Sequence, residues 1–205
     1  TVSSVADNGF QQPSQSVVLR WNKVALDATG LDHSAAGAKE QLGPTKSSRA
    51  MAMVHLAMHD SLQRIEGRYE TYLPATRTTG AISAEAAVSY AAHDTLVALY
   101  PSQRATFDGI LTNELSSLER GAALSAGQTL GQDVALAILN DRSNDGSDNA
   151  SQSTPAYVLG TAAGQWRRDP INPGQQPLGP NWGKVRLFAV NNAGLVRSPA
   201  PPALG

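Results

Sequence analysis

The sequence predicts an all-α fold, a helical bundle followed by a long irregular arm rich in proline and glycine. Apolar residues recur at helical spacing in five segments between residues 14 and 140. Residues 141–155 are turn-forming and polar, and residues 160–205 contain most of the prolines without a helical period. We therefore expect two domains, a bundle at residues 1–140 and an arm at residues 141–205 that packs on another body of protein.

The composition narrows the functional classes. The chain has 205 residues, enough for one well-buried domain, and its charged fraction of 16% is low. A net charge of -1 shows no excess of basic residues of the kind that binds nucleic acid or an anionic membrane. No apolar run reaches the roughly 18 residues that span a bilayer. Because the chain begins at Thr1 without a signal peptide and contains no cysteine, we expect a mature secreted or periplasmic protein.

The first helix is expected at residues 14–29, after a polar arm at residues 1–13. Apolar residues around Trp21 lie at helical spacing there. Gly30 is a suitable C-terminal cap, because glycine accepts the left-handed backbone that ends many helices. Residues 31–44 then form a connecting loop.

The second helix should run from about residue 46 to residue 66. Thr45 or Ser47 can cap its N-terminus, and Gly67 can end it. An apolar stripe follows one face of this segment. A loop at residues 68–82 comes next.

The third helix is expected at residues 84–99. Ser83 is a good N-cap, and Glu85 lies in the first turn, where the helix dipole favours a negative charge. Tyr100 and Pro101 should stop the helix, because the residue before a proline is disfavoured in the helical conformation.

Two further helices complete the predicted bundle. Ser102 should cap the fourth helix, which ends near residue 118, and Ser125 should cap the fifth, which ends near residue 140. Gly127 and Gly131 lie on one face of the fifth helix. Because neither has a side chain, we expect another helix to approach closely there.

The second helix carries Arg49, His55, His59 and Asp60 among mostly apolar residues. His55 and His59 stand at i and i+4 on one face and could chelate a metal. The metalloprotease pattern requires Glu directly after the first His, where this chain has Leu56, and Asp60 is rotated by about 100° from His59. We therefore favour a buried structural polar cluster and predict no metal ligand in it.

The segment at residues 141–148 resembles a calcium loop only superficially. It contains three aspartates and a glycine, but the EF-hand pattern requires Glu six residues after the glycine, where this chain has Gln152. We expect turns stabilised by Asp and Asn side chains, and no bound calcium.

Trp182, Lys184 and Arg186 place an aromatic ring beside two cations. This combination could bind an anion, but it is more typical of a packing seam along which long cationic side chains lie. The sequence contains no P-loop, no G-x-S-x-G and no G-x-G-x-x-G motif. From these residues alone, the chain is a helical domain without a complete active site.

Four segments, in order along the chain, resemble the N-terminal half of vanadium-dependent haloperoxidases. They are RWNKVALDA at 20–28, GPTKSSRAMAMVHLAMHDS at 43–61, GQWRRDPINP at 164–173 and GPNWGKVRLF at 179–188. The likeness is greatest to the bacterial, chloroperoxidase-like branch of the phosphatidic acid phosphatase type 2 superfamily. It implies the first half of a two-bundle fold, with the irregular arm crossing to the second bundle.

The resemblance also implies where the chemistry lies. Members of the family oxidise halide with peroxide and hold vanadate in a cage of Lys, Arg, Ser and Gly donors with an axial histidine. The cage includes a Ser-Gly-His segment from the second half of the protein, and this sequence contains no such triplet. We therefore expect no catalytic residue in this chain and vanadate bound by a missing C-terminal half. Pro44 and Trp182 match regions near the mouth of the substrate channel.

The partners expected from the resemblance are halide, peroxide and a second polypeptide with the C-terminal half of the fold. Cleavage in the proline-rich segment before Gly205 would produce such a pair, and a truncated inactive product is the alternative. Neither the oligomeric state nor the halide is specified by this half. A related acid phosphatase and a non-catalytic helical interaction domain are the other functions that we consider.

Overall fold

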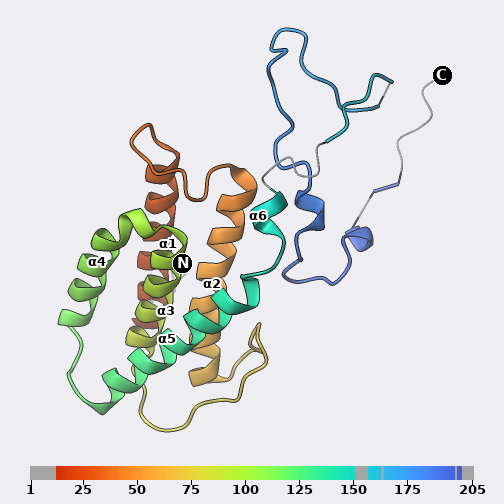
Figure 1. Cartoon of the computed structure of the whole chain (residues 1–205). Helices are drawn as coiled ribbons and strands as arrows, with labels where there is room; N and C mark the ends of the chain where they lie inside the picture. Colours follow the sequence, from red (N-terminus) through yellow and green to blue (C-terminus); the bar gives the residue numbers. More distant parts are fainter. Residues whose placement is uncertain (1–12, 151–156, 163, 197, 200–205) are drawn as a thin grey trace, which may run out of the picture. The chain divides into compact units, whose positions relative to one another are not determined.

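The computed structural model describes residues 13–150, 157–162, 164–196 and 198–199. Close packing of the backbone divides the chain into two units, residues 1–141 and residues 142–205. The first unit is a helical bundle, and the described part of the chain contains no strand (Figure 1). The all-α fold expected from the sequence is therefore confirmed. None of the helices within the described residues is both long and apolar enough to cross a bilayer.

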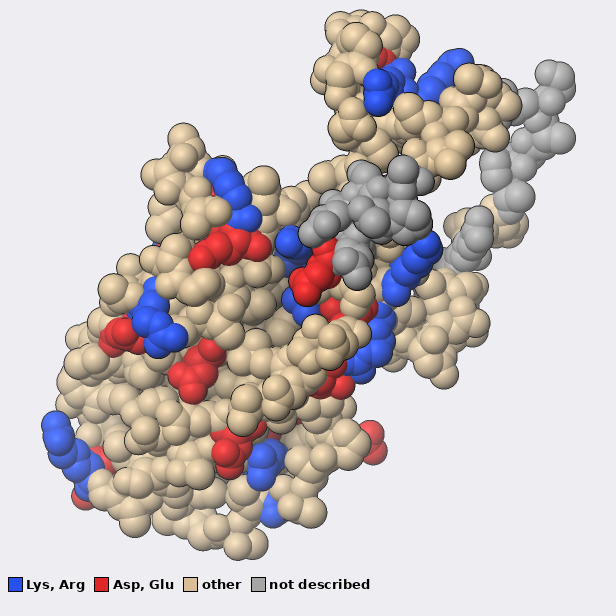
Figure 2. All heavy atoms as spheres, in the orientation of Figure 1, with Lys and Arg blue, Asp and Glu red and all other residues tan. Residues whose placement is uncertain are grey.

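Five long helices begin in the first unit. They are α1 (Pro13–His33), α2 (Pro44–Glu66), α3 (Ala84–Leu99), α4 (Arg104–Ser116) and α5 (Ala122–Arg142), with a 3-10 turn η1 (Pro101–Gln103) before α4. On the face shown in Figure 2, acidic and basic side chains are interspersed and neutral residues cover most of the surface of this unit.

Helix α3 lies at the centre of the bundle. Eleven of its 16 residues are buried, many of them alanines, so neighbouring helices can approach on several sides. Trp21 of α1 is fully buried and donates from Nε1 to Ser89 Oγ at 3.1 Å. On another side, α5 approaches closely. A Cβ added to its Gly127 would lie 2.5 Å from the carbonyl oxygen of Ser83, the N-cap of α3, and one added to Gly131 would lie 2.3 Å from that of Ala87. The close approach expected at these two glycines is confirmed.

Two helix boundaries differ from the sequence prediction because of hydrogen bonds made by His33. Helix α1 continues through Gly30 to His33, whose Nδ1 lies 2.9 Å from the carbonyl oxygen of Thr29. Helix α2 begins at Pro44, with Gly43 as its N-cap at φ 97 and no side-chain cap. The backbone N–H of Gly43 donates to His33 Nε2 at 3.0 Å, so a histidine of α1 takes the role expected of Thr45 or Ser47.

At the other helix ends the predictions are partly confirmed. Ser83 caps α3 by accepting from the N–H of Ala86, and Gly67 ends α2 in the left-handed conformation at φ 66. Ser102 lies in η1 and Ser125 lies inside α5, so neither is the cap that was expected. The backbone N–H of Ser125 already donates to the carbonyl oxygen of Gly121 at 3.1 Å.

The second unit is mostly irregular in its described residues. Its helical pieces are α6 (Ser147–Ala150), η2 (Trp182–Lys184) and η3 (Ala193–Val196), none longer than four residues. That this arm packs on a second helical bundle stays a prediction.

Candidate functional site

Two polar residues of α2 hold the loop that follows it. Asp60 is 3% exposed, and its two carboxylate oxygens accept the backbone N–H groups of Tyr72 at 2.7 Å and Leu73 at 3.0 Å. His59 lies with Nε2 at 3.0 Å from the carbonyl oxygen of Glu70. A buried carboxylate with two N–H donors is satisfied, so these contacts fix the loop rather than provide a free acid.

His55 faces a different element. Its Nε2 lies 3.0 Å from Asn22 Oδ1 on α1, and burial lowers the pKa of His55 from its ordinary value. Arg49 is half-buried near the start of α2. His55, His59 and Asp60 therefore bond to different groups. Within the described residues, no three side chains of the metal-ligating types converge on a common point.

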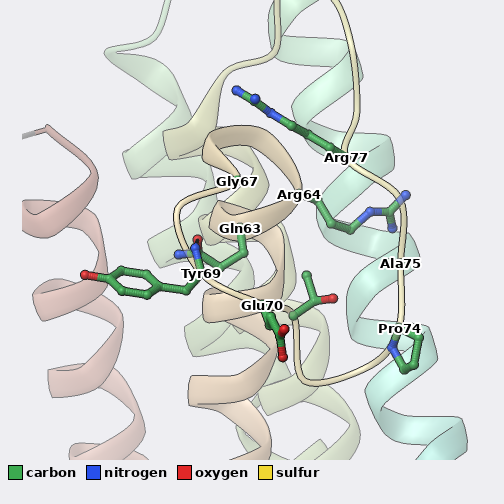
Figure 3. Close-up of a pocket in the computed structure, with 9 residues that line it drawn as sticks. Gln63, Arg64, Gly67, Tyr69, Glu70, Pro74, Ala75 and Arg77 are labelled. Carbon is green, nitrogen blue, oxygen red and sulfur yellow. Dashed lines mark hydrogen bonds between the residues drawn. The ribbon is translucent and has the colours of Figure 1, made fainter.

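The C-terminal turn of α2 and the following loop enclose a cavity of about 420 Å³ (Figure 3). Three carbonyl oxygens at this helix end accept hydrogen bonds. Thr78 donates to that of Arg64 from N at 2.7 Å and from Oγ1 at 2.8 Å. Arg77 donates from Nε to that of Ile65 at 3.1 Å, and Gly67 N donates to that of Gln63 at 2.8 Å. The cavity walls are thus tied to the helix end.

The opposite end of α2 is held by two residues that the sequence reasoning missed. Asp32 is fully buried and accepts the backbone N–H groups of Glu40 at 2.7 Å and Gln41 at 2.9 Å. Because His33 Nε2 accepts from the N–H of Gly43, the proton of a neutral His33 ring is on Nδ1 and donates to Thr29. The available signal was an Asp-His pair one loop before a Gly-Pro helix start, at residues 32–33 and 43–44.

His93 of α3, like His33, has no role assigned from the sequence. Its Nδ1 lies 2.7 Å from Asp94 Oδ1 and its Nε2 lies 2.8 Å from Asp108 Oδ1 on α4, while its ring meets Trp21 edge-to-face. Burial alone would lower the pKa of His93, but the hydrogen bonds and charges of the two aspartates outweigh burial and raise it. This contact joins α3 and α4 most strongly when the ring is protonated.

The second unit is organised around Arg142, which is fully buried. Its guanidinium donates from Nε to Asp145 Oδ2 at 3.0 Å, contacts the backbone oxygens of Arg186 and Leu187, and lies 3.8 Å from the ring centre of Phe188. The other oxygen of Asp145 accepts the backbone N–H of residue 147 at 3.0 Å. Asp145, in the segment that superficially resembles a calcium loop, is therefore an ion-pair partner.

Comparison with known proteins identifies the family. Residues 10–176 match the family described as vanadium chloroperoxidase N-terminal domain. The chain belongs to this family. The match spans all the long helices and the first part of the irregular arm, and it ends before the segment at 179–188. No curated protein gives a significant match to the chain.

Whether this chloroperoxidase N-terminal domain can hold vanadate itself depends on which of its side chains are available as ligands. All four histidines use a ring nitrogen on a protein group: His33 on Gly43, His55 on Asn22, His59 on Glu70 and His93 on two aspartates. In His33 and in His93 both ring nitrogens are bonded in this way. The described residues of this vanadium chloroperoxidase N-terminal domain do not fit vanadate.

The two residues expected near a substrate channel belong to different units. Pro44 is exposed at the first turn of α2, in the first unit, and Trp182 is half-buried at the start of η2, in the second. The segment containing Trp182 contacts the turn at 142–147, because Arg186 N donates to the carbonyl oxygen of Asp145 at 2.9 Å. A role for Pro44 and Trp182 at a channel mouth stays a prediction.

Proposed function

We propose that this chain is the N-terminal scaffold half of a vanadium-dependent haloperoxidase-like enzyme, which oxidises halide with peroxide. The observation that carries the proposal is the family match over residues 10–176. The vanadate site is supplied by a C-terminal half outside these 205 residues, since the sequence has no Ser-Gly-His segment and its described histidines are engaged elsewhere.

The scaffold role is supported by how the polar groups are used. Asp32, Asp60 and Arg142 are buried, and each is bonded to backbone groups of a neighbouring loop. Such contacts fix loop positions and leave these groups unavailable as acids, bases or ligands. These buried groups are therefore suited to hold loops in place rather than to react.

Apolar exposure in the second unit supports a partner bundle. Val158 is 87% exposed, Ile171 92%, Leu178 72% and Leu195 70%. These side chains offer apolar surface that would be removed from water if another body of protein packed on the arm. The proposed partner is the C-terminal half of the same fold, on a second polypeptide if the protein is cleaved. A secreted or periplasmic location is part of the same proposal.

The proposal is tested on the complete protein purified from its source. Gel electrophoresis and mass spectrometry establish whether a second polypeptide accompanies the chain. Halide oxidation is then measured with vanadate and peroxide, together with phosphatase activity on a synthetic phosphate ester. We expect vanadate-dependent halide oxidation by the complete protein. Phosphatase activity alone would support the related acid phosphatase, and the lack of both activities would support a non-catalytic interaction domain.

A further inference from the structure

We propose that the cavity at the C-terminal end of α2 binds a small oxyanion, phosphate or carboxylate, on the guanidinium of Arg64. The cavity holds about 420 Å³ and lies between the last turns of α2 and the loop at residues 67–79. In Figure 3 the side chain of Arg64 leaves the helix and extends toward the loop near Ala75. The inference does not depend on the haloperoxidase proposal.

The guanidinium of Arg64 is incompletely bonded. Its Nε is buried and meets no hydrogen-bond partner within the described residues. A cationic group with one N–H removed from water and unbonded is poorly solvated there, so its charge is incompletely compensated. An oxyanion on the two outer nitrogens would compensate that charge, and the planar guanidinium matches the two oxygens of a carboxylate or phosphate.

The charges around the cavity favour a single negative charge. Arg64 and Arg77 line it against one acid, Glu70, so the formal balance is one positive charge. Figure 3 shows the Glu70 side chain directed away from that of Arg64. Three carbonyl oxygens at the helix end, which would otherwise repel an anion, are bonded to Gly67, Arg77 and Thr78.

The cavity is also largely preformed. The Arg77 side chain packs over Gly67, where an added Cβ would lie 3.0 Å from Cδ of Arg77. Asp60 and His59 fix the loop backbone at residues 70–73 through three hydrogen bonds. Because the loop is already ordered, a ligand would lose little binding free energy to immobilising it.

The test is a titration of the 205-residue chain with inorganic phosphate and, separately, with acetate at constant ionic strength. Binding is followed by calorimetry and by the amide NMR signals of residues 69–77. We expect saturable binding of at least one anion. Arg64→Gln should weaken it about tenfold or more, the loss expected for a charged hydrogen bond. Glu70→Gln should tighten binding, because it removes the negative charge from the cavity wall.

The matched control is Arg120→Gln, which removes the same charge from an exposed position outside the cavity. It should leave the dissociation constant within about twofold, the change expected when a surface charge is screened by salt. Circular dichroism must show the same helix content in all variants. Equal dissociation constants for the Arg64→Gln variant and the unsubstituted chain, or no saturable change at residues 69–77 with either anion, would overturn the proposal. Saturable binding of phosphate alone, or of acetate alone, supports the proposal and identifies which oxyanion the cavity takes.

Discussion

The contact between His93 and two aspartates predicts an unusual pH dependence of stability. A protonated ring has two N–H donors, so it can bond Asp94 at 2.7 Å and Asp108 at 2.8 Å together. A neutral ring has one donor, which leaves the second carboxylate facing a lone pair. Because the folded-state pKa of His93 is raised, its stabilising contribution is complete below the unfolded value of about 6.5 and is lost as pH rises through the folded value.

The perturbation is His93→Gln, which removes the charge and keeps a hydrogen-bonding side chain. Each hydrogen bond to a charged group contributes about 1.5–3 kcal/mol. The Asp108 side chain is 51% exposed and that of Asp94 is 31% exposed, so solvent screening reduces this contribution. We expect the substitution to lower the free energy of unfolding by about 2 kcal/mol at pH 5.5.

The assay is urea unfolding followed by circular dichroism between pH 5.5 and pH 8.5. The difference in unfolding free energy between the unsubstituted chain and the His93→Gln variant should be largest at the acidic end and shrink as pH rises. His55→Gln is the comparison variant, because burial lowers the pKa of His55 and its contribution is lost as pH falls. A difference for His93→Gln that is constant with pH, or grows toward alkaline pH, would refute this reasoning.

Four further substitutions test the helix packing and the buried polar contacts. Gly131→Ala should destabilise the bundle by about 1–3 kcal/mol in thermal unfolding, since its Cβ would lie 2.3 Å from a backbone oxygen of α3. Gly109→Ala on α4, where nothing lies within 4 Å, should instead be neutral or stabilising by up to about 1 kcal/mol; equal losses would contradict the close approach. Asp60→Ala leaves two backbone N–H groups without their acceptor, so we expect about 2–3 kcal/mol lower stability and faster hydrogen exchange in the following loop; unchanged exchange would show that Asp60 does not hold the loop. Arg142→Met leaves the buried Asp145 carboxylate uncompensated and should cost about 3 kcal/mol or more, seen as faster proteolysis within the second unit; unaltered cleavage would contradict the role of this ion pair.

The parts of the bundle that the sequence predicts correctly depend on local chemistry. Ser83 caps α3 and Gly67 ends α2 because a hydroxyl acceptor and a left-handed glycine act within one turn. The glycine pair on α5 indicated a close helix contact for a similarly simple reason, the absence of side chains. The partner helix could not be named from the pattern, since packing partners are set by the whole fold.

The misplaced features depend on contacts between distant residues. Helix α1 passes Gly30 because the segment after it is tied back by Asp32 and His33, which bond residues up to ten positions away. The role of His93 requires Asp108 from another helix, 15 residues later. Arg142 is buried against backbone groups more than 40 residues further along the chain. Helical periodicity carries no information about such pairs.

The central claim is that this family member supports vanadate-dependent halide oxidation without holding the reaction centre. The most direct measurement adds increasing amounts of the 205-residue chain to a separately purified C-terminal half of the fold and records the initial rate of halide oxidation with vanadate and peroxide. We expect no oxidation by either half alone, and a rate that saturates at one chain per C-terminal half. Oxidation by this chain alone, or full oxidation by the C-terminal half without it, would contradict the claim.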